Sequence, residues 1–323
     1  MSPIFSILFE PLMFVLAAML VLLLITRIFS KRIGLRICLW VTLILSLLAI
    51  VPALRTVSHR ALIYPKLQLP NSLTIMSYNT HQMAGAGLPE QNRVIDYIRR
   101  TNADIVCLQE VEVHKDNHHL TLTSLKQALS MYPYTYFDFK VYNSRRQYGN
   151  AVFSRYPLID KHTLRYESRG NITSVCDIVL PNDTIRLYTN HLESNRLSRA
   201  DIDEEHLSAS SELVKSKLNS AASVRAKQAE ALRNDITQAP YKVIVAGDFN
   251  DTPASYTYHL IQHGLKDAFL ESSNLELGHT FTMYHLGVRI DYILHSPEMS
   301  ASHFRIDQVD YSDHYPILTT IHY

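Results

Sequence analysis

Short β-rich runs alternate with helical patterns along most of this 323-residue chain, and this alternation restricts the folds it can adopt. Strands are predicted at residues 73–78, 104–108, 134–139, 151–154, 173–180, 185–190, 242–246, 288–295 and 315–321. Helices are predicted at residues 90–100, 119–131 and 221–236, the last after a polar loop that begins at residue 193. Mixed strands and helices indicate an α/β protein. The helix-poor middle block indicates antiparallel pairing, with hairpin turns at Pro157 and at residues 181–183.

Polar residues end, abut or lie within six strand-like runs, one set standing just before the last run. They are Asn79, Glu110, Asn190 with His191, Asp248 with Asn250, Asp291, and Asp313 with His314. Because a sheet brings the ends of strands that are distant in sequence to one edge, these side chains are predicted to converge on a crevice. Each residue taken singly has a simpler interpretation, since Asn and Asp often end a strand by turning the chain. All six sets are centred on Asn, Asp, Glu or His and none on Lys or Arg, which favours convergence on one site.

These residue types point to metal-assisted hydrolysis. Carboxylate and amide oxygens suit Mg²⁺ or Mn²⁺, and His191 and His314 can exchange protons near neutral pH. Asp313 directly precedes His314, so on a strand their side chains would point to opposite faces, and Asp291 is the predicted partner of the imidazole. The sequence has no nucleophile elbow, no glycine-rich phosphate loop and no Cys/His zinc spacing, and its three cysteines are scattered in apolar runs. Acyl transfer, nucleoside triphosphate hydrolysis and zinc hydrolysis therefore lack support.

Two motifs are the most specific: Gly-Asp-Phe-Asn at residues 247–250 and Ser-Asp-His-Tyr-Pro at residues 312–316. Supporting motifs are Leu108-Gln109-Glu110, Tyr148-Gly149-Asn150, Phe153-Ser154-Arg155, Asn190-His191-Leu192 and Ile290-Asp291-Tyr292. In this order and combination the sequence resembles the endonuclease/exonuclease/phosphatase superfamily, which includes type I deoxyribonucleases, abasic-site endonucleases, neutral sphingomyelinases and inositol-polyphosphate 5-phosphatases. The resemblance covers about residues 73–323. It implies a four-layered α/β sandwich, in which two facing mixed β-sheets are flanked by helices.

The resemblance also implies roles for individual residues. Glu110, Asn79 and Asp313 would bind the metal, and Asn150 and Asn190 would bind substrate. Asp248 and Asn250 would position the attacking water and a phosphate oxygen. Asp291 would orient His314, and His191 would assist the leaving group. Either Asp248 or His314 could take the proton from water. His81 stands where some abasic-site endonucleases of the family carry an acidic residue, which puts a second metal ligand there in doubt.

Residues 1–54 are predicted to form a membrane anchor of two transmembrane helices, at about residues 8–27 and 37–54. The loop between the two apolar runs contains Arg27, Lys31, Arg32 and Arg36, which places it in the cytoplasm by the positive-inside rule. Residues 55–70 are then a connector, and the catalytic domain at residues 71–323 is extracytoplasmic. A cleavable signal peptide is the alternative, but the first ten residues have no Lys or Arg and no Ala-x-Ala pattern follows either run.

The formal net charge of +1 conceals an uneven distribution. Residues 1–54 carry a net charge of +3, and the remaining 27 basic and 29 acidic residues give the rest of the chain a net charge of −2. A broad basic surface for nucleic acid is therefore not expected. The predicted function is a membrane-anchored, Mg²⁺-dependent phosphoesterase that cuts a phosphodiester in a lipid headgroup or a small phosphorylated metabolite.

Two alternatives stay open. The first is a nuclease that acts on DNA or RNA, and the second is a catalytically silent, membrane-tethered binding module. No obligate protein partner is inferred; the lipid bilayer and the phosphoester substrate are the expected partners. The histidines at positions 114, 118, 119 and 162 lie in polar stretches and are predicted to belong to a solvated surface.

Overall fold

The computed structural model describes residues 20, 40–41, 69–85, 87–116, 118–143, 145–168, 170–197, 207–272, 278–283 and 286–323. Within these residues, no helix is both long enough and apolar enough to cross a bilayer. The two predicted transmembrane helices lie outside the described part of the chain, apart from Leu20, Trp40 and Val41.

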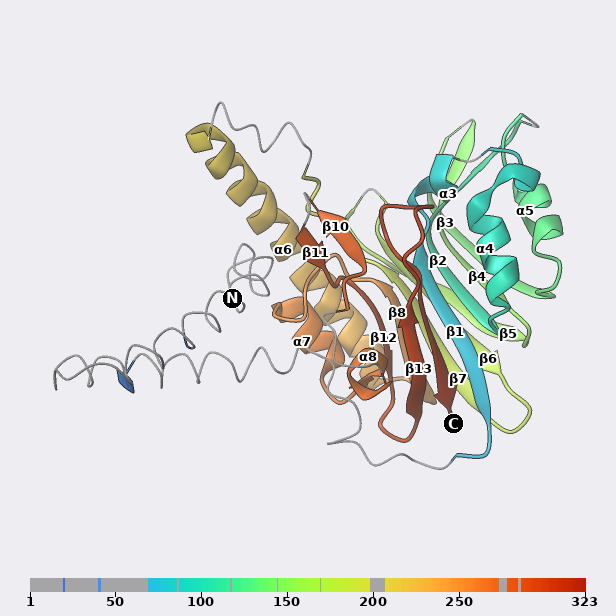
Figure 1. Ribbon diagram of the computed structural model, residues 1–323. Coiled ribbons are helices and arrows are strands. Elements are labelled where there is room, and N and C mark those ends of the chain that lie inside the picture. The colour runs from blue at the N-terminus through green and yellow to red at the C-terminus, as the bar shows by residue number, and fades with distance from the viewer. Residues whose placement is uncertain are drawn as a thin grey trace.

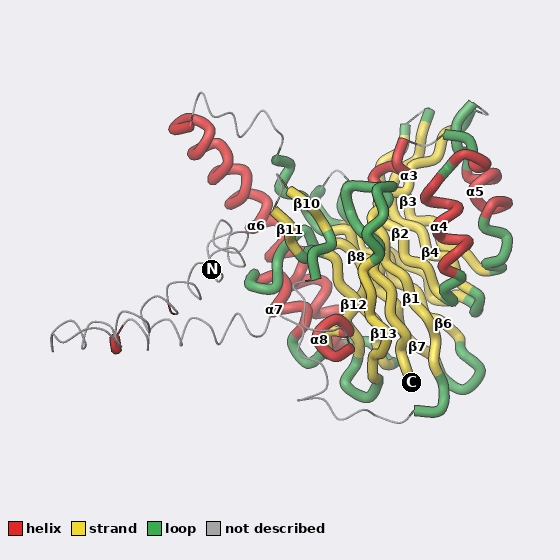
Figure 2. Tube along the Cα trace, in the orientation of Figure 1, coloured by secondary structure: helices red, strands yellow, loops and turns green. Residues whose placement is uncertain are grey.

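Two six-stranded sheets form the centre of the protein (Figures 1 and 2). The first sheet has the order β13 (Ser300–Ile306), β14 (Ile317–His322), β1 (Ser72–Asn79), β2 (Ile105–His114), β4 (Arg146–Ser154) and β3 (Tyr134–Tyr142). The second has the order β5 (Leu158–Arg165), β6 (Ile172–Val179), β7 (Thr184–His191), β8 (Lys242–Asp248), β12 (Asp291–His295) and β9 (Lys266–Asp267). Both sheets are mixed, because β1 and β2 pair in parallel, as do β7 and β8, whereas the other pairs are antiparallel.

The apolar faces of the sheets explain the layers. Buried residues of both sheets, including Ile75, Cys107, Leu187 and Ile244, form one cluster between them. The outer face of the first sheet packs against α4 (Arg93–Thr101) and α5 (Leu122–Ala128), and that of the second against α6 (Leu207–Thr237) and α7 (Tyr256–Gln262). A sheet that is apolar on both faces must be covered on both sides. The predicted α/β architecture of two mixed sheets flanked by helices is therefore present.

Local signals explain where helix α4 begins and ends. The side chain of Asn92 accepts hydrogen bonds from the backbone N–H groups of Val94 and Ile95, which caps the start of α4. Asn102 adopts a left-handed conformation and ends the helix. Between these caps the apolar side chains recur at helical spacing and lie on the first sheet.

Three predictions about local structure were wrong. Pro157 does not form a hairpin turn, because it lies between β4 and β5, which belong to different sheets. The strand predicted at residues 288–295 does not begin at residue 288, because β11 (Leu286–Val288) ends there and β12 begins at Asp291. Helix α6 is longer than predicted: it begins at Leu207, and its N-terminal part extends away from the sheets (Figure 1).

Several short elements escaped prediction because their apolar pattern is weak. They are β5, β9, β13, α7, α8 (Ala268–Ser272), α3 (His81–Gly85), the short helix at Pro89–Gln91, and the hairpin of β10 (Phe281–Met283) with β11. Strand β5 is an edge strand and carries Asp160, Lys161 and His162, which keep an exposed edge soluble but remove the alternation that identifies a strand.

Candidate active site

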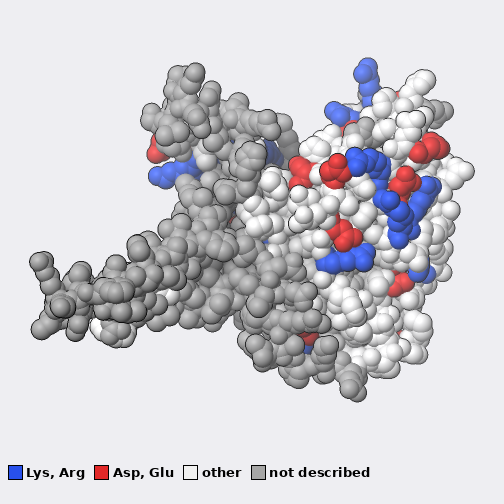
Figure 3. All heavy atoms as spheres, in the orientation of Figure 1, with Lys and Arg blue, Asp and Glu red and all other residues white. Residues whose placement is uncertain are grey.

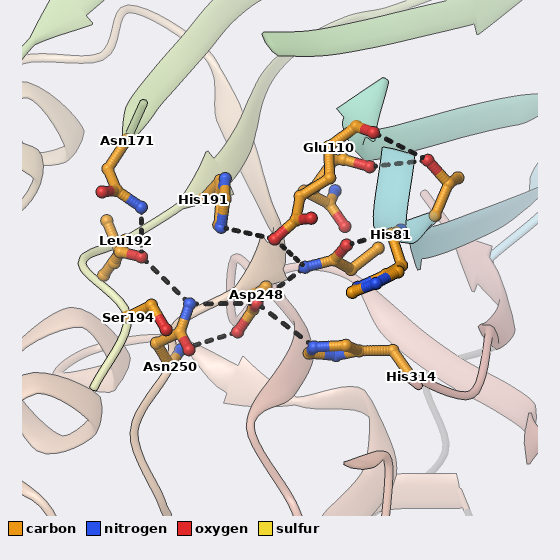
Figure 4. Close-up of polar contacts among 12 residues, drawn as sticks. His81, Glu110, Asn171, His191, Leu192, Ser194, Asp248, Asn250 and His314 are labelled. Atoms are coloured by element: carbon orange, nitrogen blue, oxygen red, sulfur yellow. Dashed lines mark hydrogen bonds and ion pairs between the residues drawn. The ribbon is translucent and has the colours of Figure 1, made fainter. Parts of the chain in front are cut away.

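Sheet topology brings the predicted site residues to one edge of the sandwich. Asn79 ends β1 and pairs with Gln109, the residue before Glu110 in the parallel strand β2, and the carboxyl ends of the parallel strands β7 and β8 carry His191 and Asp248. Asp291 begins β12, which runs antiparallel to β8 with Asp291 opposite Asp248. His314 precedes β14, which runs antiparallel to β1. Strand direction therefore explains why residues at both ends of strands meet at one place (Figure 4).

Glu110 lies at a β-bulge. The pairing of β2 with β4 shifts register between Leu108 and Val111, and Glu110 has a φ of 55°, in the left-handed region. A bulge changes the direction of a side chain relative to the regular pleat, and a left-handed non-glycine residue is a strained conformation that often marks a functional site. Strand β2 continues to His114, so Glu110 is not at the end of a strand as predicted.

The carboxylate of Glu110 has two neighbours of different kinds. Asn79 Nδ2 donates a hydrogen bond to Glu110 Oε1 over 3.4 Å, and the Tyr148 hydroxyl also bonds to this carboxylate. Burial, followed by the charge of Glu110, raises the pKa of Tyr148 far above its usual value, so the phenol stays protonated and acts as a donor. Glu110 keeps part of its side chain, 20%, exposed at the site.

Asp248 accepts three hydrogen bonds. Its Oδ1 accepts from the Asn250 backbone N–H (2.7 Å), and its Oδ2 accepts from Asn250 Nδ2 (3.0 Å) and from Asn79 Nδ2 (3.0 Å). Gly247 allows β8 to approach β7 here, because a Cβ on this residue would lie 2.1 Å from the Asn190 carbonyl oxygen. Burial is the main cause that raises the pKa of Asp248, to about 6, although the nearby His314 opposes it.

His314 lies between two carboxylates. Its Nδ1 is 2.9 Å from Asp291 Oδ2, and its Nε2 is 3.7 Å from Asp248 Oδ2. The ring also packs against Phe281, with 4.7 Å between ring centroids. Burial lowers the pKa of His314, but the charges of Asp291 and Asp248 outweigh it and raise the pKa to about 10. The imidazole is therefore protonated at neutral pH.

His191 faces Glu110 from the second sheet (Figure 4). Its Nε2 is 3.4 Å from Glu110 Oε1, without hydrogen-bond geometry, and neither ring nitrogen has a hydrogen-bond partner among the described residues. Buried polar atoms are normally paired, so two unpaired ring nitrogens at this edge indicate a place for a polar ligand. Asp291 Oδ1 is likewise buried without a partner in the described part of the chain.

Asp313 and His81 form the outer rim. His81 Nδ1 is 3.2 Å from Asp313 Oδ2, and both side chains are about half exposed. Ser312 Oγ donates to the Asn79 carbonyl, which fixes the loop of Asp313 beside the end of β1. The residues from His81 to Ala84 all have left-handed backbone angles, so the chain turns sharply as it leaves β1.

The two residues predicted to bind substrate are held inside the protein. Asn190 Oδ1 accepts from the Thr173 hydroxyl, and Asn190 Nδ2 donates to the Ala246 carbonyl. Asn150 lies in β4 and donates to Ser174 and to the Thr189 carbonyl of the second sheet, while its Oδ1 has no partner among the described residues. Both are fully buried, and their visible contacts connect strands and sheets. Their role in substrate binding stays a prediction.

The donors at this edge suit a divalent cation. Glu110 and Asp313 offer carboxylate oxygens, Asn79 offers an amide oxygen, and the unpaired nitrogens of His191 lie next to Glu110. Oxygen donors that leave room for water and substrate are the usual environment of Mg²⁺. Asp248, Asp291 and His314 also have possible ligand atoms within 4.8 Å of one another. In this structure His314 contacts Asp291 directly, so the three side chains interact with one another and share protons instead of offering free metal ligands.

Three residues of the site were not singled out from the sequence. In the sequence Tyr148 stands out only as part of the Tyr-Gly-Asn motif, and Phe281 and Thr280 come from a short segment with no strand pattern. Thr280 Oγ1 accepts from the backbone N–H groups of Ile290 and Asp291, which holds Asp291 in place. Only the tertiary pairing of residues 280–281 with the His314 loop reveals their position.

Comparison with known proteins agrees with this geometry. The sequence profile of the Endonuclease/Exonuclease/phosphatase family matches residues 76–314, from strand β1 to His314. The chain belongs to this family. No curated protein matches the sequence. Members of the Endonuclease/Exonuclease/phosphatase family hydrolyse phosphoester bonds and generally depend on a divalent metal, which supports a hydrolase with an acidic metal site here.

Solved structures share the fold at low sequence identity. An endonuclease/exonuclease/phosphatase from Beutenbergia cavernae is 18% identical, with a TM-score of 0.58 over 78% of this chain and 71% of that one. Truncated Caenorhabditis elegans TDP2 is 19% identical, with a TM-score of 0.54 over 78% and 98% of the two chains. Sphingomyelinase C from Streptomyces griseocarneus is 17% identical, with a TM-score of 0.51 over 77% and 99%. These similarities establish the fold.

Proposed function

We propose that the protein is a divalent-metal-dependent phosphoesterase that hydrolyses a phosphodiester by in-line attack of water. The observation that carries this proposal is the buried series Asp291–His314–Asp248 facing Glu110 across the junction of the two sheets. An acid–base pair and a carboxylate suited to a metal, placed side by side, are what water-mediated phosphoester cleavage requires.

Hydrogen bonding separates the roles of Asp248 and His314. Three N–H groups donate to Asp248, which favours its ionised form and makes it the acceptor for the proton of the attacking water. Two carboxylates flank His314, which favours the imidazolium form, so His314 donates to a phosphate oxygen. His191 is assigned as the donor to the leaving group, and the support is its two buried ring nitrogens, which have no hydrogen-bond partner among the described residues.

Glu110, Asn79 and Asp313 are the residues proposed to hold the metal, with Mg²⁺ as the expected ion and Mn²⁺ as a possible substitute. The bound ion would neutralise charge on the phosphate oxygens. Tyr148 and Asn79 fix the carboxylate of Glu110 and so keep its direction toward the site. The substrate-facing roles of Asn150 and Asn190 are secondary in this proposal, because their contacts are internal.

We favour a lipid headgroup or a small phosphorylated metabolite as substrate. Two arginines on the side of the first sheet are paired with carboxylates: Arg93 with Asp310 at 2.6 Å, and Arg305 with Asp307 at 3.3 Å. On the face shown in Figure 3, Lys and Arg side chains lie among Asp and Glu and form no continuous strip. A long polyanion needs a run of unpaired basic groups to bind its backbone, whereas a single phosphoester does not.

The N-terminal segment is proposed to tether the enzyme to a membrane through two helices, with the catalytic domain on the extracytoplasmic side. The support is the pair of uncharged runs at about residues 8–27 and 37–54 and the basic loop between them. Membrane fractionation, followed by proteolysis of intact and permeabilised cells, tests this topology. Cleavage of the catalytic domain only after the membrane that holds the anchor is itself permeabilised would refute the orientation.

Hydrolysis of bis-(p-nitrophenyl) phosphate tests the catalytic assignment. With Mg²⁺, Glu110→Gln and His314→Ala are expected to lower kcat/KM by about 10²–10⁴-fold, and EDTA to remove activity. His162→Ala, on the distant edge strand β5, is the control and should retain wild-type activity. Metal-independent turnover, or unchanged turnover in both site variants, would refute the proposal.

A second comparison tests the substrate class. Phosphocholine release from sphingomyelin vesicles and hydrolysis of small phosphodiesters are measured beside nicking of supercoiled plasmid, at equal enzyme concentration. We expect headgroup release or small-diester turnover to exceed nicking. Efficient nicking without turnover of either other substrate would establish the nuclease alternative, and binding without any turnover would establish the silent module.

A further inference from the structure

A second cluster of ligating side chains lies at the far end of β2. His114 ends this strand, and Asp116 and His119 follow in the loop before α5. Each of the three offers a ligand atom, and these atoms all lie within 4.8 Å of one another. The sequence had suggested that His114 belongs to a solvated surface, but its side chain is only 16% exposed.

His114 is held by a buried carboxylate. Its Nε2 is 3.1 Å from Glu112 Oε1, and Glu112 also accepts from Arg146 Nη1, at 3.3 Å from Oε2. A carboxylate paired with arginine is ionised and can only accept, so Nε2 of His114 must carry the proton. The lone pair of the neutral ring is then on Nδ1, which faces Asp116 Oδ2 at 4.0 Å.

Asp116 and His119 complete the cluster from the exposed side. His119 Nδ1 is 2.6 Å from Asp116 Oδ1, and the His119 ring stacks on the His114 ring with 4.4 Å between centroids. Both Asp116 and His119 side chains are about half exposed. They can therefore rotate, while His114 is fixed by Glu112 and Arg146.

We propose that His114, Asp116 and His119 bind a divalent transition-metal ion of the Zn²⁺ class at a site separate from the catalytic centre. Two imidazoles and one carboxylate favour Zn²⁺ over Mg²⁺, which prefers oxygen donors only. Three protein ligands leave a fourth position for water, as the exposure of Asp116 and His119 allows.

The contact with Glu112 is the strongest reason to expect a metal here. Histidine ligands commonly donate their second ring N–H to a carboxylate, which sets the tautomer and increases the basicity of the ligating nitrogen. A solvated surface histidine needs no buried carboxylate and arginine behind it. Binding requires two changes. The half-exposed His119 ring must turn out of its stack on His114, because the in-plane lone pairs of nearly parallel rings do not converge on one ion. The contact of 2.6 Å between Asp116 and His119 must also open to roughly 3.3 Å for tetrahedral ligands with bonds of about 2.0 Å.

The proposed site differs from the catalytic one in place as well as in ligands. Glu110 and His114 lie on the same strand, and four residues of extended chain span about 13 Å. A bound ion would attach the loop of Asp116 and His119 to the end of the strand that carries Glu110. Zinc binding can therefore be measured without relying on catalysis.

The test uses full-length protein in detergent, purified without a histidine tag and stripped of metal. Zn²⁺ affinity is measured by competition with a chromophoric chelator, and Co²⁺ binding by its visible absorption. All variants carry Glu110→Ala to weaken the catalytic site. In this background His119→Ala should lower Zn²⁺ affinity at least 100-fold and abolish the Co²⁺ band, and Glu112→Gln should lower affinity about 10–100-fold.

His162→Ala in the same background is the matched control and should bind Zn²⁺ like its parent. Circular dichroism confirms that each variant is folded. Equal Zn²⁺ affinity in the His119→Ala, His162→Ala and parent proteins would overturn the proposal and leave the cluster as a stacked histidine pair with an ion pair. An unchanged affinity in Glu112→Gln would refute the role assigned to the buried carboxylate.

Discussion

Gly247 joins the fold to the site, and its replacement by alanine tests that connection. Gly247 in β8 lies opposite Asn190 in β7, with a φ of 129°. An added Cβ would lie 2.1 Å from the Asn190 carbonyl oxygen and 2.7 Å from its backbone nitrogen. These atoms belong to the backbone and cannot rotate away. The two strands would have to separate at the position that carries His191 and Asp248.

Two effects add in the free energy of unfolding. Forcing an extra carbon into a packed position costs about 1–3 kcal/mol, and an unfavourable backbone conformation for a non-glycine residue costs about 1–3 kcal/mol. Gly247→Ala is therefore expected to lower the free energy of unfolding by about 2–6 kcal/mol. With a urea dependence of about 3 kcal/mol per molar, the midpoint should fall by roughly 0.7–2 M.

Urea unfolding followed by circular dichroism measures this change, and Gly87→Ala is the control. Gly87 has no atom within 4 Å of the position of an added Cβ, so its replacement should change stability by less than about 1 kcal/mol. Gly247→Ala should also lower kcat/KM by about 100-fold at temperatures where it remains folded, because small displacements of reacting groups are costly. Equal midpoints and equal activities in the two variants would refute the argument.

Three other predictions concern buried groups. Asp291→Asn removes a charge that raises the pKa of His314, so the loss of activity with rising pH should occur at lower pH, as a pH–rate profile would show; an unchanged alkaline limb would contradict this. Arg289→Ala removes the guanidinium that lies 2.7 Å from the buried carboxylate of Asp267. It should lower the free energy of unfolding by about 3–5 kcal/mol in urea titrations, and a change below about 1 kcal/mol would contradict this prediction. Burial raises the pKa of Cys107 to about 12, so its thiol should react with a disulfide reagent only after unfolding, and rapid reaction of the native protein would refute this.

The sequence alone was sufficient for the fold class and for the convergence of several polar residues. Alternating strand and helix patterns predicted an α/β protein, and the family resemblance implied two mixed sheets flanked by helices. The polar residues at strand ends predicted a convergence that the structure confirms for Asn79, Asp248 and Asp291. These features are local, because hydrophobic period and turn chemistry are written in consecutive residues. The partnership of His314 with Asp291 followed from the same reasoning, since adjacent residues on a strand face opposite ways.

Tertiary structure decided what depends on pairing between distant segments. The bulge that directs Glu110, the crossing from β4 to β5 at Pro157, and the contact of Phe281 with His314 come from register and packing between strands. The same holds for His114, whose surroundings are set by Glu112 and by Arg146 on the neighbouring strand. A residue's chemistry is fixed by its type, but its burial, its partners and the direction of its side chain are fixed only when the sheets close.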